Sequence, residues 1–222
     1  DLIAVIPHEG LGNGDTSKLN DIWGWTDPET GIEYATVGMN TGVAFIDLRY
    51  PYCPRNLGEL PRVSQNSNWR DIKVIGNHAY VGAEDNGGLQ VFDLTRLRGV
   101  ESPKTWSADH TIRLGHSHNV VVNEHAPRLY VVLSADCSGG LSIFDLEDDP
   151  GRPVQVGCWS EERIHDAHCF VYDGPDTEHR GKEVCITSND RASSISIVDV
   201  DDPSRPRTLA TLAYPGSYSH QG

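Results

Sequence analysis

The chain has 222 residues, with 22 glycines, 13 prolines and an apolar share of 37%. Lysine and arginine total 18 against 32 aspartates and glutamates, so the formal net charge is −14. Such a negative field repels nucleic-acid phosphates and anionic lipid, so neither is an expected partner. The many turn-forming residues favour short strands over long helices. No run of about 18 apolar residues occurs, so no transmembrane segment is predicted.

Four segments of the chain end in the same pattern, in which alternating apolar positions lead to an aspartate and then, in most of them, to a turn with proline. The segments are GVAFIDLRYPYCP (42–54), GLQVFDLTRL (88–97), GLSIFDLEDDPGRP (140–153) and SISIVDVDDPSRP (194–206). Their shared aspartates are Asp47, Asp93, Asp145 and Asp199, at intervals of 46, 52 and 54 residues. Alternation of this kind is typical of a half-buried strand.

A second motif precedes each of these strands and opens another strand. Its aligned pairs are Asn20-Asp21, Arg70-Asp71, His118-Asn119, His165-Asp166 and His220-Gln221. Between the two motifs lies a third strand-like piece, and a more variable fourth follows the aspartate. Four antiparallel strands repeating every 45 to 55 residues predict one blade of a β-propeller per repeat.

The repeat predicts an all-β chain that forms a single β-propeller domain over residues 1–222. Its four complete blades are expected near 20–66, 67–115, 116–162 and 163–216, and the start of a fifth near 217–222. Because the sequence stops inside a recognisable motif, we expect a domain that is incomplete at its C-terminus. It would be a fragment of a larger ring, unless a partner supplies the rest.

The endings of the IVDVDDPSRP type are similar to LVIVD repeats, which form propellers in surface and secreted proteins. The ordered run of DIWGW, WRDIKV, GLQVFDLT, SHNVVVNE, CSGGLSIFDL, HDAHCFVYDGPD, KEVCITSND and YSHQG resembles the choice-of-anchor B family over nearly the whole chain. This resemblance implies a secreted or cell-surface protein with a variable anchor. It implies no established reaction.

In a propeller the first strand of each blade lines the central channel, so its first residues are expected near the channel mouth. The aligned motif would bring His118, His165 and His220 together there, with Asp166 beside them. Three imidazoles with a nearby carboxylate could hold zinc, copper or iron. His168 and His116 could add ligands or supporting hydrogen bonds, although Asn20 and Arg70 break the ring of histidines. Arg70 would then need Asp71 or an anionic ligand as its partner.

The alternative for the same motif is structural. A short polar side chain at the start of an inner strand often accepts hydrogen bonds from backbone N–H groups of the next blade. For the Asp, Asn and Gln positions this interpretation is the favoured one.

Acidic turns offer a weaker possibility for calcium. The candidates are Asp173 with Asp176, Glu147-Asp148-Asp149, and Asp201-Asp202. None follows an EF-hand loop, and Asp before Pro is ordinary turn chemistry.

Five cysteines allow two disulfides and one free thiol. Cys169 and Cys185 flank an expected hairpin, and Cys137 and Cys158 flank the strand GLSIFDL, so each pair could bridge neighbouring strands. Disulfides would indicate an oxidising compartment, whereas buried reduced thiols are the alternative. Cys53 has no evident partner.

The sequence contains no GxSxG, HExxH, Walker or dinucleotide-binding motif, so whether the protein is an enzyme stays open. The favoured function is an extracellular binding or scaffolding module with a protein partner or a surface assembly. A metal-dependent enzyme or metalloprotein centred on the histidines, with Asp166 or Asp71 as base or supporting partner, is the alternative. Carbohydrate stacking on one of the five tryptophans is a weaker possibility.

Overall fold

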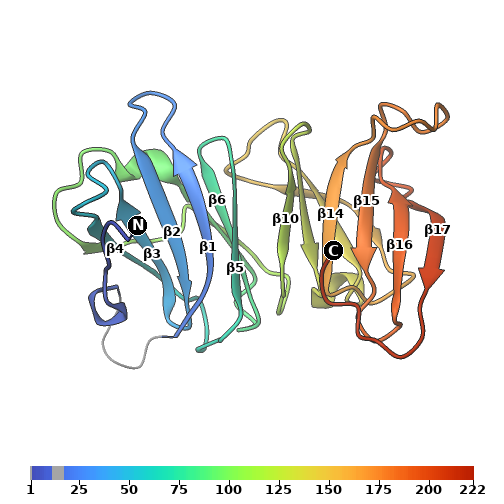
Figure 1. Ribbon diagram of the computed structural model, residues 1–222, viewed down its shortest axis with the longest axis horizontal. Coiled ribbons are helices and arrows are strands. Elements are labelled where there is room, and N and C mark those ends of the chain that lie inside the picture. Colours follow the sequence, from blue (N-terminus) through green and yellow to red (C-terminus); the bar gives the residue numbers. More distant parts are fainter. Residues whose placement is uncertain (1, 12–17) are drawn as a thin grey trace. The chain divides into compact units, whose positions relative to one another are not determined.

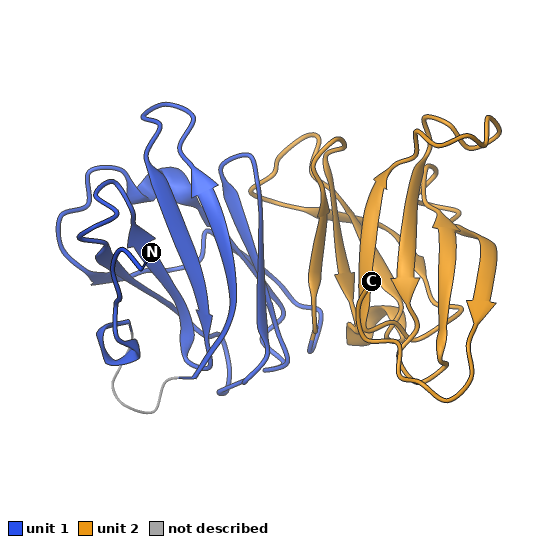
Figure 2. Cartoon of the chain, viewed as in Figure 1, with its two compact units in different colours: residues 1–116 blue, residues 117–222 orange. Residues whose placement is uncertain are grey.

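The computed structural model describes residues 2–11 and 18–222, and its regular secondary structure is almost wholly β-strand (Figure 1). The helices in these residues are single 3-10 turns, namely η1 (His8–Gly10), η2 (Leu94–Leu97) and η3 (Ala135–Cys137). None of the helices in the described ranges has the length and apolar character needed to cross a membrane. The chain divides into two compact units, Asp1–His116 and Ser117–Gly222 (Figure 2).

Unit 1 contains two sheets, whose four main strands each come from one sequence repeat. The first has the order β1-β2-β3-β4-β8, with β1 (Leu19–Thr26), β2 (Glu33–Met39), β3 (Gly42–Asp47), β4 (Arg55–Pro61) and the short β8 (Lys104–Thr105). Its first four strands are antiparallel, and β8 adds to β4 in parallel. The second has the order β5-β6-β7-β9, with β5 (Arg70–Ile75), β6 (His78–Ala83), β7 (Leu89–Asp93) and β9 (His110–Ile112).

Unit 2 contains the other two sheets, both four-stranded and antiparallel. One has the order β10-β11-β12-β13, with β10 (Val120–Asn123), β11 (Arg128–Val132), β12 (Leu141–Asp145) and β13 (Val154–Trp159). The other has the order β14-β15-β16-β17, with β14 (Asp166–Val171), β15 (Glu183–Ser188), β16 (Ser194–Asp199) and β17 (Arg207–Ala213). The four sheets therefore match the blades that the repeat predicts. The start of a fifth blade stays a prediction, as does the extent of a single domain over 1–222.

In each unit, the two sheets pack face to face through an apolar core. We call the side of a sheet that meets the following sheet its forward face, and the opposite side its rear face. In unit 1, the forward face of the β1–β4 sheet (Trp25, Tyr34, Phe45) packs on the rear face of the next sheet (Ile72, Phe92). The Phe45 and Phe92 rings stack with centroids 4.5 Å apart. Alternation along the strands produces this arrangement, since neighbouring residues point to opposite faces.

Unit 2 repeats the arrangement with different side chains. The forward face of the β10–β13 sheet contributes Tyr130, Ile143 and Trp159, and the rear face of the β14–β17 sheet contributes Cys185 and Val198. The Trp159 indole donates a hydrogen bond to Thr208 Oγ1 at 3.0 Å, on the outer strand β17. This bond fastens the outer edges of the two blades together.

The segment of the second repeat that follows η2 extends onto the first blade within unit 1. After η2 the chain runs along β4 as β8 and places Trp106 in the core, where its indole N–H donates to the Leu57 carbonyl at 3.0 Å. Gly58 permits this approach because its φ is +110° and a Cβ there would lie 1.8 Å from the Lys104 carbonyl oxygen. Only glycine fits at this position.

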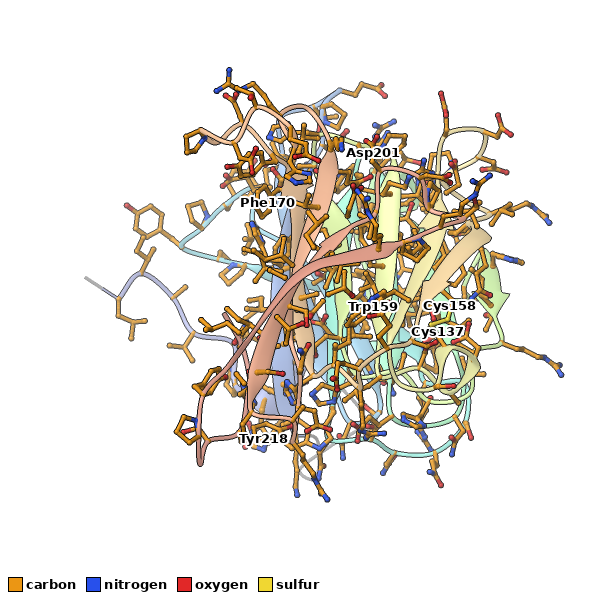
Figure 3. All side chains as sticks on the ribbon, turned by 90° about the vertical axis from the view of Figure 1, so that its right-hand side faces the viewer. Cys137, Cys158, Trp159, Phe170, Asp201 and Tyr218 are labelled. Atoms are coloured by element: carbon orange, nitrogen blue, oxygen red, sulfur yellow. A yellow bond between two sulfur atoms is a disulfide. The ribbon has the colours of Figure 1, made fainter. Side chains whose placement is uncertain are left out.

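Both predicted disulfides are present, and both lie in unit 2. Cys137 bonds Cys158 across the edge of the β10–β13 sheet (Figure 3). Cys169 bonds Cys185 between directly paired positions of β14 and β15. The prediction from the flanking positions is therefore confirmed. Cys53 is exposed and unbonded.

Candidate functional site

The polar motif at the start of the inner strands has a structural role in unit 1. Asn20 Oδ1 accepts a hydrogen bond from the Arg70 N–H at 2.9 Å, and Asp21 Oδ2 accepts one from the Ile72 N–H at 3.0 Å. These bonds join the first strand of one blade to the first strand of the next. The structural interpretation of this motif is thus confirmed for the pair of blades in unit 1.

Arg70 does not pair as the sequence suggested. Its side chain is only 1% exposed, its Nε donates to the Met39 carbonyl at 2.9 Å, and its guanidinium bonds Asp85 Oδ2 at 3.2 Å. Asp71 instead contacts the Lys73 ammonium group at 2.8 Å. The pairing with Asp71 was wrong because Arg70 and Asp71 are successive residues of β5 and point to opposite faces.

In unit 2 the same motif brings three histidines together. The His165 ring lies between two others, with ring centroids 4.3 Å from His118 and 4.1 Å from His220. The Tyr218 ring is 5.5 Å from that of His165 and is 49% exposed. We call His118, His165, Tyr218 and His220 the histidine cluster. Its members come from the start of three successive repeats, as the sequence alignment predicted.

The chain after β17 is held by hydrogen bonds against the start of β14, the end of β15 and the start of β16. His165 Nδ1 lies 2.8 Å from the His220 carbonyl oxygen, and Ser219 forms an isolated bridge with Asp190. A carbonyl only accepts, so we assign the proton of His165 to Nδ1, which leaves a lone pair on Nε2. The Ser219 hydroxyl also donates to the Ser194 carbonyl at 2.9 Å.

Burial lowers the pKa of His165, and the adjacent His118 imidazole lowers it further. The hydrogen bond to the His220 carbonyl and the charge of Asp166 act in the opposite direction without reversing the shift. His165 is 7% exposed, so a charged form would lose its hydration. The centre of the cluster is therefore a neutral imidazole at pH 7.

A second polar group borders the cluster. Arg163 Nε donates to Asp190 Oδ2 at 2.8 Å, and Asp190 is 5% exposed. Burial alone would raise the pKa of Asp190, but the hydrogen bonds from Arg163 and Tyr218 lower it overall. Burial and the nearby Asp190 raise the pKa of the Tyr218 phenol. The exposed end of the cluster thus presents a neutral phenol beside a paired carboxylate.

The structure places the remaining predicted residues as follows. Asp166 is buried at the start of β14. His168 is exposed on the forward face of the same strand, where its ring lies 5.4 Å from that of Phe170. It therefore does not join the stack of three rings in this structure. Sequence reasoning did not single out Tyr218, although it stands two residues before His220 in the YSHQG motif.

The histidine rings pack too closely to share an ion as they stand. Zinc bonds imidazole nitrogen at about 2 Å, so the rings of three ligands have centroids about 5 Å apart. The measured separations are about 1 Å shorter. Consistently, no group of three or more His, Cys, Asp or Glu side chains is arranged to hold a metal in the part of the chain that the structure describes.

The acidic turns proposed for calcium bind their own backbone. Asp149 Oδ1 accepts from the Gly151 N–H at 2.9 Å, and Asp202 Oδ1 accepts from the Ser204 N–H at 3.1 Å. Asp176 makes the same contact with the Glu178 N–H at 3.0 Å. Each is the turn that an aspartate two residues upstream typically stabilises.

No protein-family model and no curated protein matches the chain. Solved structures do match it. The β-propeller domain of Cps50 (Swd1) from Myceliophteria thermophila is 14% identical with a TM-score of 0.54, over 84% of this chain and 57% of that one. A functionally unknown protein from Desulfotomaculum acetoxidans is 12% identical with a TM-score of 0.60, over 96% and 60% of the two chains.

A third match is an auxiliary nutrient binding protein from Bacteroides thetaiotaomicron, 14% identical with a TM-score of 0.52, over 86% of this chain and 47% of that one. The chain thus spans roughly half to three fifths of each of these three structures. At these identities the matches establish the fold alone. Together with the four-stranded antiparallel blades, they make this chain a β-propeller.

The buried His165 predicts a pH dependence of stability. Its folded pKa is lowered, so below pH 6.5 the unfolded state binds the proton more readily. The contribution of the neutral His165 to the stability of unit 2 is fully present above pH 6.5, and it is lost as the pH falls toward the folded pKa. We expect urea unfolding of unit 2, followed by Trp159 fluorescence, to show a lower midpoint at pH 5 than at pH 7. His165→Asn, which keeps an N–H donor without titrating, should reduce this difference between the urea midpoints at pH 5 and pH 7. An unchanged difference would contradict the lowered pKa of His165.

The buried Asp71 predicts that the stability of unit 1 changes with pH in the opposite direction. Burial and the neighbouring Asp21 carboxylate together raise its pKa to about 7, against the opposing effect of the Lys73 ammonium group. Between pH 4 and pH 7 the folded state keeps a proton that the unfolded state has lost, so stability falls as the pH rises. Asp71→Asn should therefore raise the free energy of unfolding at pH 8 by about 1 kcal/mol and have little effect at pH 4. Denaturant titrations at the two pH values test this, and destabilisation at pH 8 would refute it.

Proposed function

We propose that this protein is an extracellular β-propeller that acts as a binding or scaffolding module at the cell surface, of the LVIVD-repeat, choice-of-anchor B type. The propeller fold supports this proposal because it presents loops on a rigid frame. The two disulfides support an oxidising compartment. The description of one structural neighbour as a nutrient binding protein points in the same direction.

The observation that carries the proposal is the histidine cluster. It joins a half-exposed phenol, exposed His220 and the buried neutral His165 at one end of unit 2. Tyrosine and histidine bury apolar surface while offering a polar tip, which suits them to binding surfaces. The chain has no recognised nucleophile motif, so binding explains this arrangement with fewer assumptions than catalysis.

The proposal is tested by adding the fluorescently labelled protein to intact cells of the organism that produces it. A surface module should bind saturably, and unlabelled protein should compete. Binding that rises linearly without competition, or no binding at all, would contradict the proposal. A polypeptide of similar size and negative charge controls for non-specific electrostatic adsorption.

A metalloprotein is the second candidate, favoured by the meeting of three imidazoles. His165 keeps the lone pair of Nε2 available, and His220 is exposed, so its ring can turn outward. His118 would supply the third nitrogen, and Asp166 could orient a ligand. Zinc, copper or iron would suit imidazole donors, and a bound ion could polarise a substrate or activate water. Binding would require the rings to separate by about 1 Å from their present packing.

The metal content of the purified protein, measured by mass spectrometry, tests this candidate. Stoichiometric zinc, copper or iron that is lost in a His118→Ala/His165→Ala variant would support it. A folded, chelator-free protein that takes up none of these metals when each is added alone would overturn it. His125→Ala/His179→Ala, which removes two histidines outside the cluster, is the control.

A further inference from the structure

A positioned guanidinium lies beside the histidine cluster. Arg163 belongs to the connection between β13 and β14, and its side chain is 59% exposed. Its Nε donates to Asp190 Oδ2 at 2.8 Å, which fixes one edge of the group. Its stem passes over Gly139, where a Cβ would lie 3.1 Å from Arg163 Cγ, so the glycine leaves room for the stem. The Nη groups of Arg163 are thus held at the surface by neighbours on two sides.

Asp190 links this guanidinium to the cluster. Asp190 is only 5% exposed, and its backbone pairs with Ser219, the residue after Tyr218. The Tyr218 phenol also hydrogen-bonds the Asp190 carboxylate, and this contact helps to lower the pKa of Asp190. One buried carboxylate therefore positions both Arg163 and Tyr218.

Positive charge exceeds negative charge around Asp190. Arg191 follows Asp190 directly and is exposed, and its charge acts with that of Arg163 to lower the pKa of Asp190 and of the Tyr218 phenol. Two guanidinium groups thus surround one buried carboxylate. A second carboxylate, brought by a ligand, would find an unused fork of N–H donors on Arg163.

The rest of the cluster offers a ring face and neutral hydrogen-bond acceptors. Tyr218 is 49% exposed, and an exposed aromatic ring can stack on the apolar face of a sugar. His165 keeps the lone pair of Nε2, and the exposed His220 adds a second imidazole. Imidazole nitrogens with a free lone pair accept hydrogen bonds from hydroxyl groups.

We infer that the histidine cluster, together with Arg163, binds a hexuronate, that is, a sugar ring that carries one carboxylate. Arg163 pairs with the carboxylate, Tyr218 stacks on the ring, and His165 Nε2 accepts from a hydroxyl. This inference rests on the proposed binding function and adds the class of ligand. The groups lie in connections at one end of the β14–β17 sheet, where Figure 3 shows Tyr218 far from Phe170 and Asp201. Such connections are where propellers present binding residues.

Two related ligands fit this arrangement less well. A dense polyanion would be repelled by the formal net charge of −14, whereas a single carboxylate meets mainly the local charge of Arg163 and Arg191. The carboxylate of an acidic peptide could pair with Arg163, but it brings no hydroxyl group to the His165 acceptor. A sugar acid supplies both groups on one ring.

The affinity is measured by titrating the full chain with sodium glucuronate or sodium galacturonate and following the histidine ring signals by NMR. We expect at least one of the two to bind, and acetate, which shares only the carboxylate, to bind at least about tenfold more weakly. Tyr218→Ala should weaken the binding of the hexuronate and leave that of acetate unchanged. No response to either hexuronate, or equal affinity for acetate, would overturn the inference.

A conservative substitution tests the role of Arg163 without removing the charge that faces Asp190. Arg163→Lys keeps the charge but lacks the planar fork, so we expect the hexuronate to bind at least about tenfold more weakly. Arg180→Lys is the matched control, because Arg180 is similarly exposed (53%) and lies beyond the opposite end of β14. Unchanged urea unfolding shows that both variants keep the fold. Equal hexuronate affinity of the wild type and Arg163→Lys would overturn the inference.

Competition on cells separates this inference from the proposed function. Free hexuronate should displace the labelled protein from intact cells of the source organism. Saturable cell binding that persists in excess hexuronate would overturn the inference and leave the proposed function standing. Hexuronate binding by a protein that does not bind cells would contradict the proposed function alone.

Discussion

Replacing Asp85 with asparagine is expected to lower the free energy of unfolding of unit 1 by about 3 kcal/mol. Asp85 and Arg70 are each 1% exposed, and their side chains meet at 3.2 Å. The variant removes the only negative charge bonded to Arg70 among the described hydrogen bonds, and it leaves the guanidinium in a medium that solvates charge poorly. Asp85 also accepts the Gly87 N–H at 2.7 Å through Oδ1, so the single amide oxygen of asparagine cannot keep both contacts. Urea unfolding followed by tryptophan fluorescence measures the change.

A matched surface pair provides the control. Arg207 bonds Asp199 at the same distance of 3.2 Å, but the Arg207 side chain is 63% exposed. Arg207→Ala should therefore cost less than about 1 kcal/mol. Equal losses for Asp85→Asn and Arg207→Ala would show that the interior of unit 1 is far more hydrated than the burial of Arg70 indicates.

Removal of the disulfide between Cys137 and Cys158 is the second large effect. The bond closes a loop with a sequence separation of 21 residues, which corresponds to about 3 kcal/mol of lost chain entropy in the unfolded state. We expect Cys137→Ser/Cys158→Ser to destabilise unit 2 by that amount. Cys53→Ser should have almost no effect, because Cys53 is exposed and unbonded.

Reduction offers an independent check of the same bond. The wild type unfolded in the presence of a reductant should lose at least as much stability as the double variant, since the bond between Cys169 and Cys185 is reduced as well. If reduction leaves the unfolding curve of the wild type unchanged, the disulfides do not stabilise this protein.

The sequence was sufficient to predict the blades because they depend on a local property. Alternation of apolar residues sets the two faces of each strand, and the repeated aspartates mark where the third strand ends. The disulfides were predictable for a related reason, since Cys169 and Cys185 occupy opposite positions of one hairpin. The convergence of the histidines followed from the equal places of His118, His165 and His220 in the repeat.

Contacts that depend on tertiary packing were not predictable in this way. No local pattern indicates that Trp106 leaves the second blade to fill the core beside Phe45, or that Arg70 pairs with Asp85 fifteen residues away. The close packing of the His165 and His220 rings depends on a carbonyl hydrogen bond that residue types alone do not encode. The role of Tyr218 depends on Asp190, which the motif did not include.

The most direct test of the central claim compares the affinity of two variants for intact cells of the source organism. Tyr218→Ala/His220→Ala removes the exposed side chains of the histidine cluster, and Tyr50→Ala/Tyr52→Ala removes two exposed tyrosines in unit 1. If the cluster is the binding site, the first variant should bind at least about tenfold more weakly while the second binds like the wild type. Equal binding by the wild type and the Tyr218→Ala/His220→Ala variant would contradict the account.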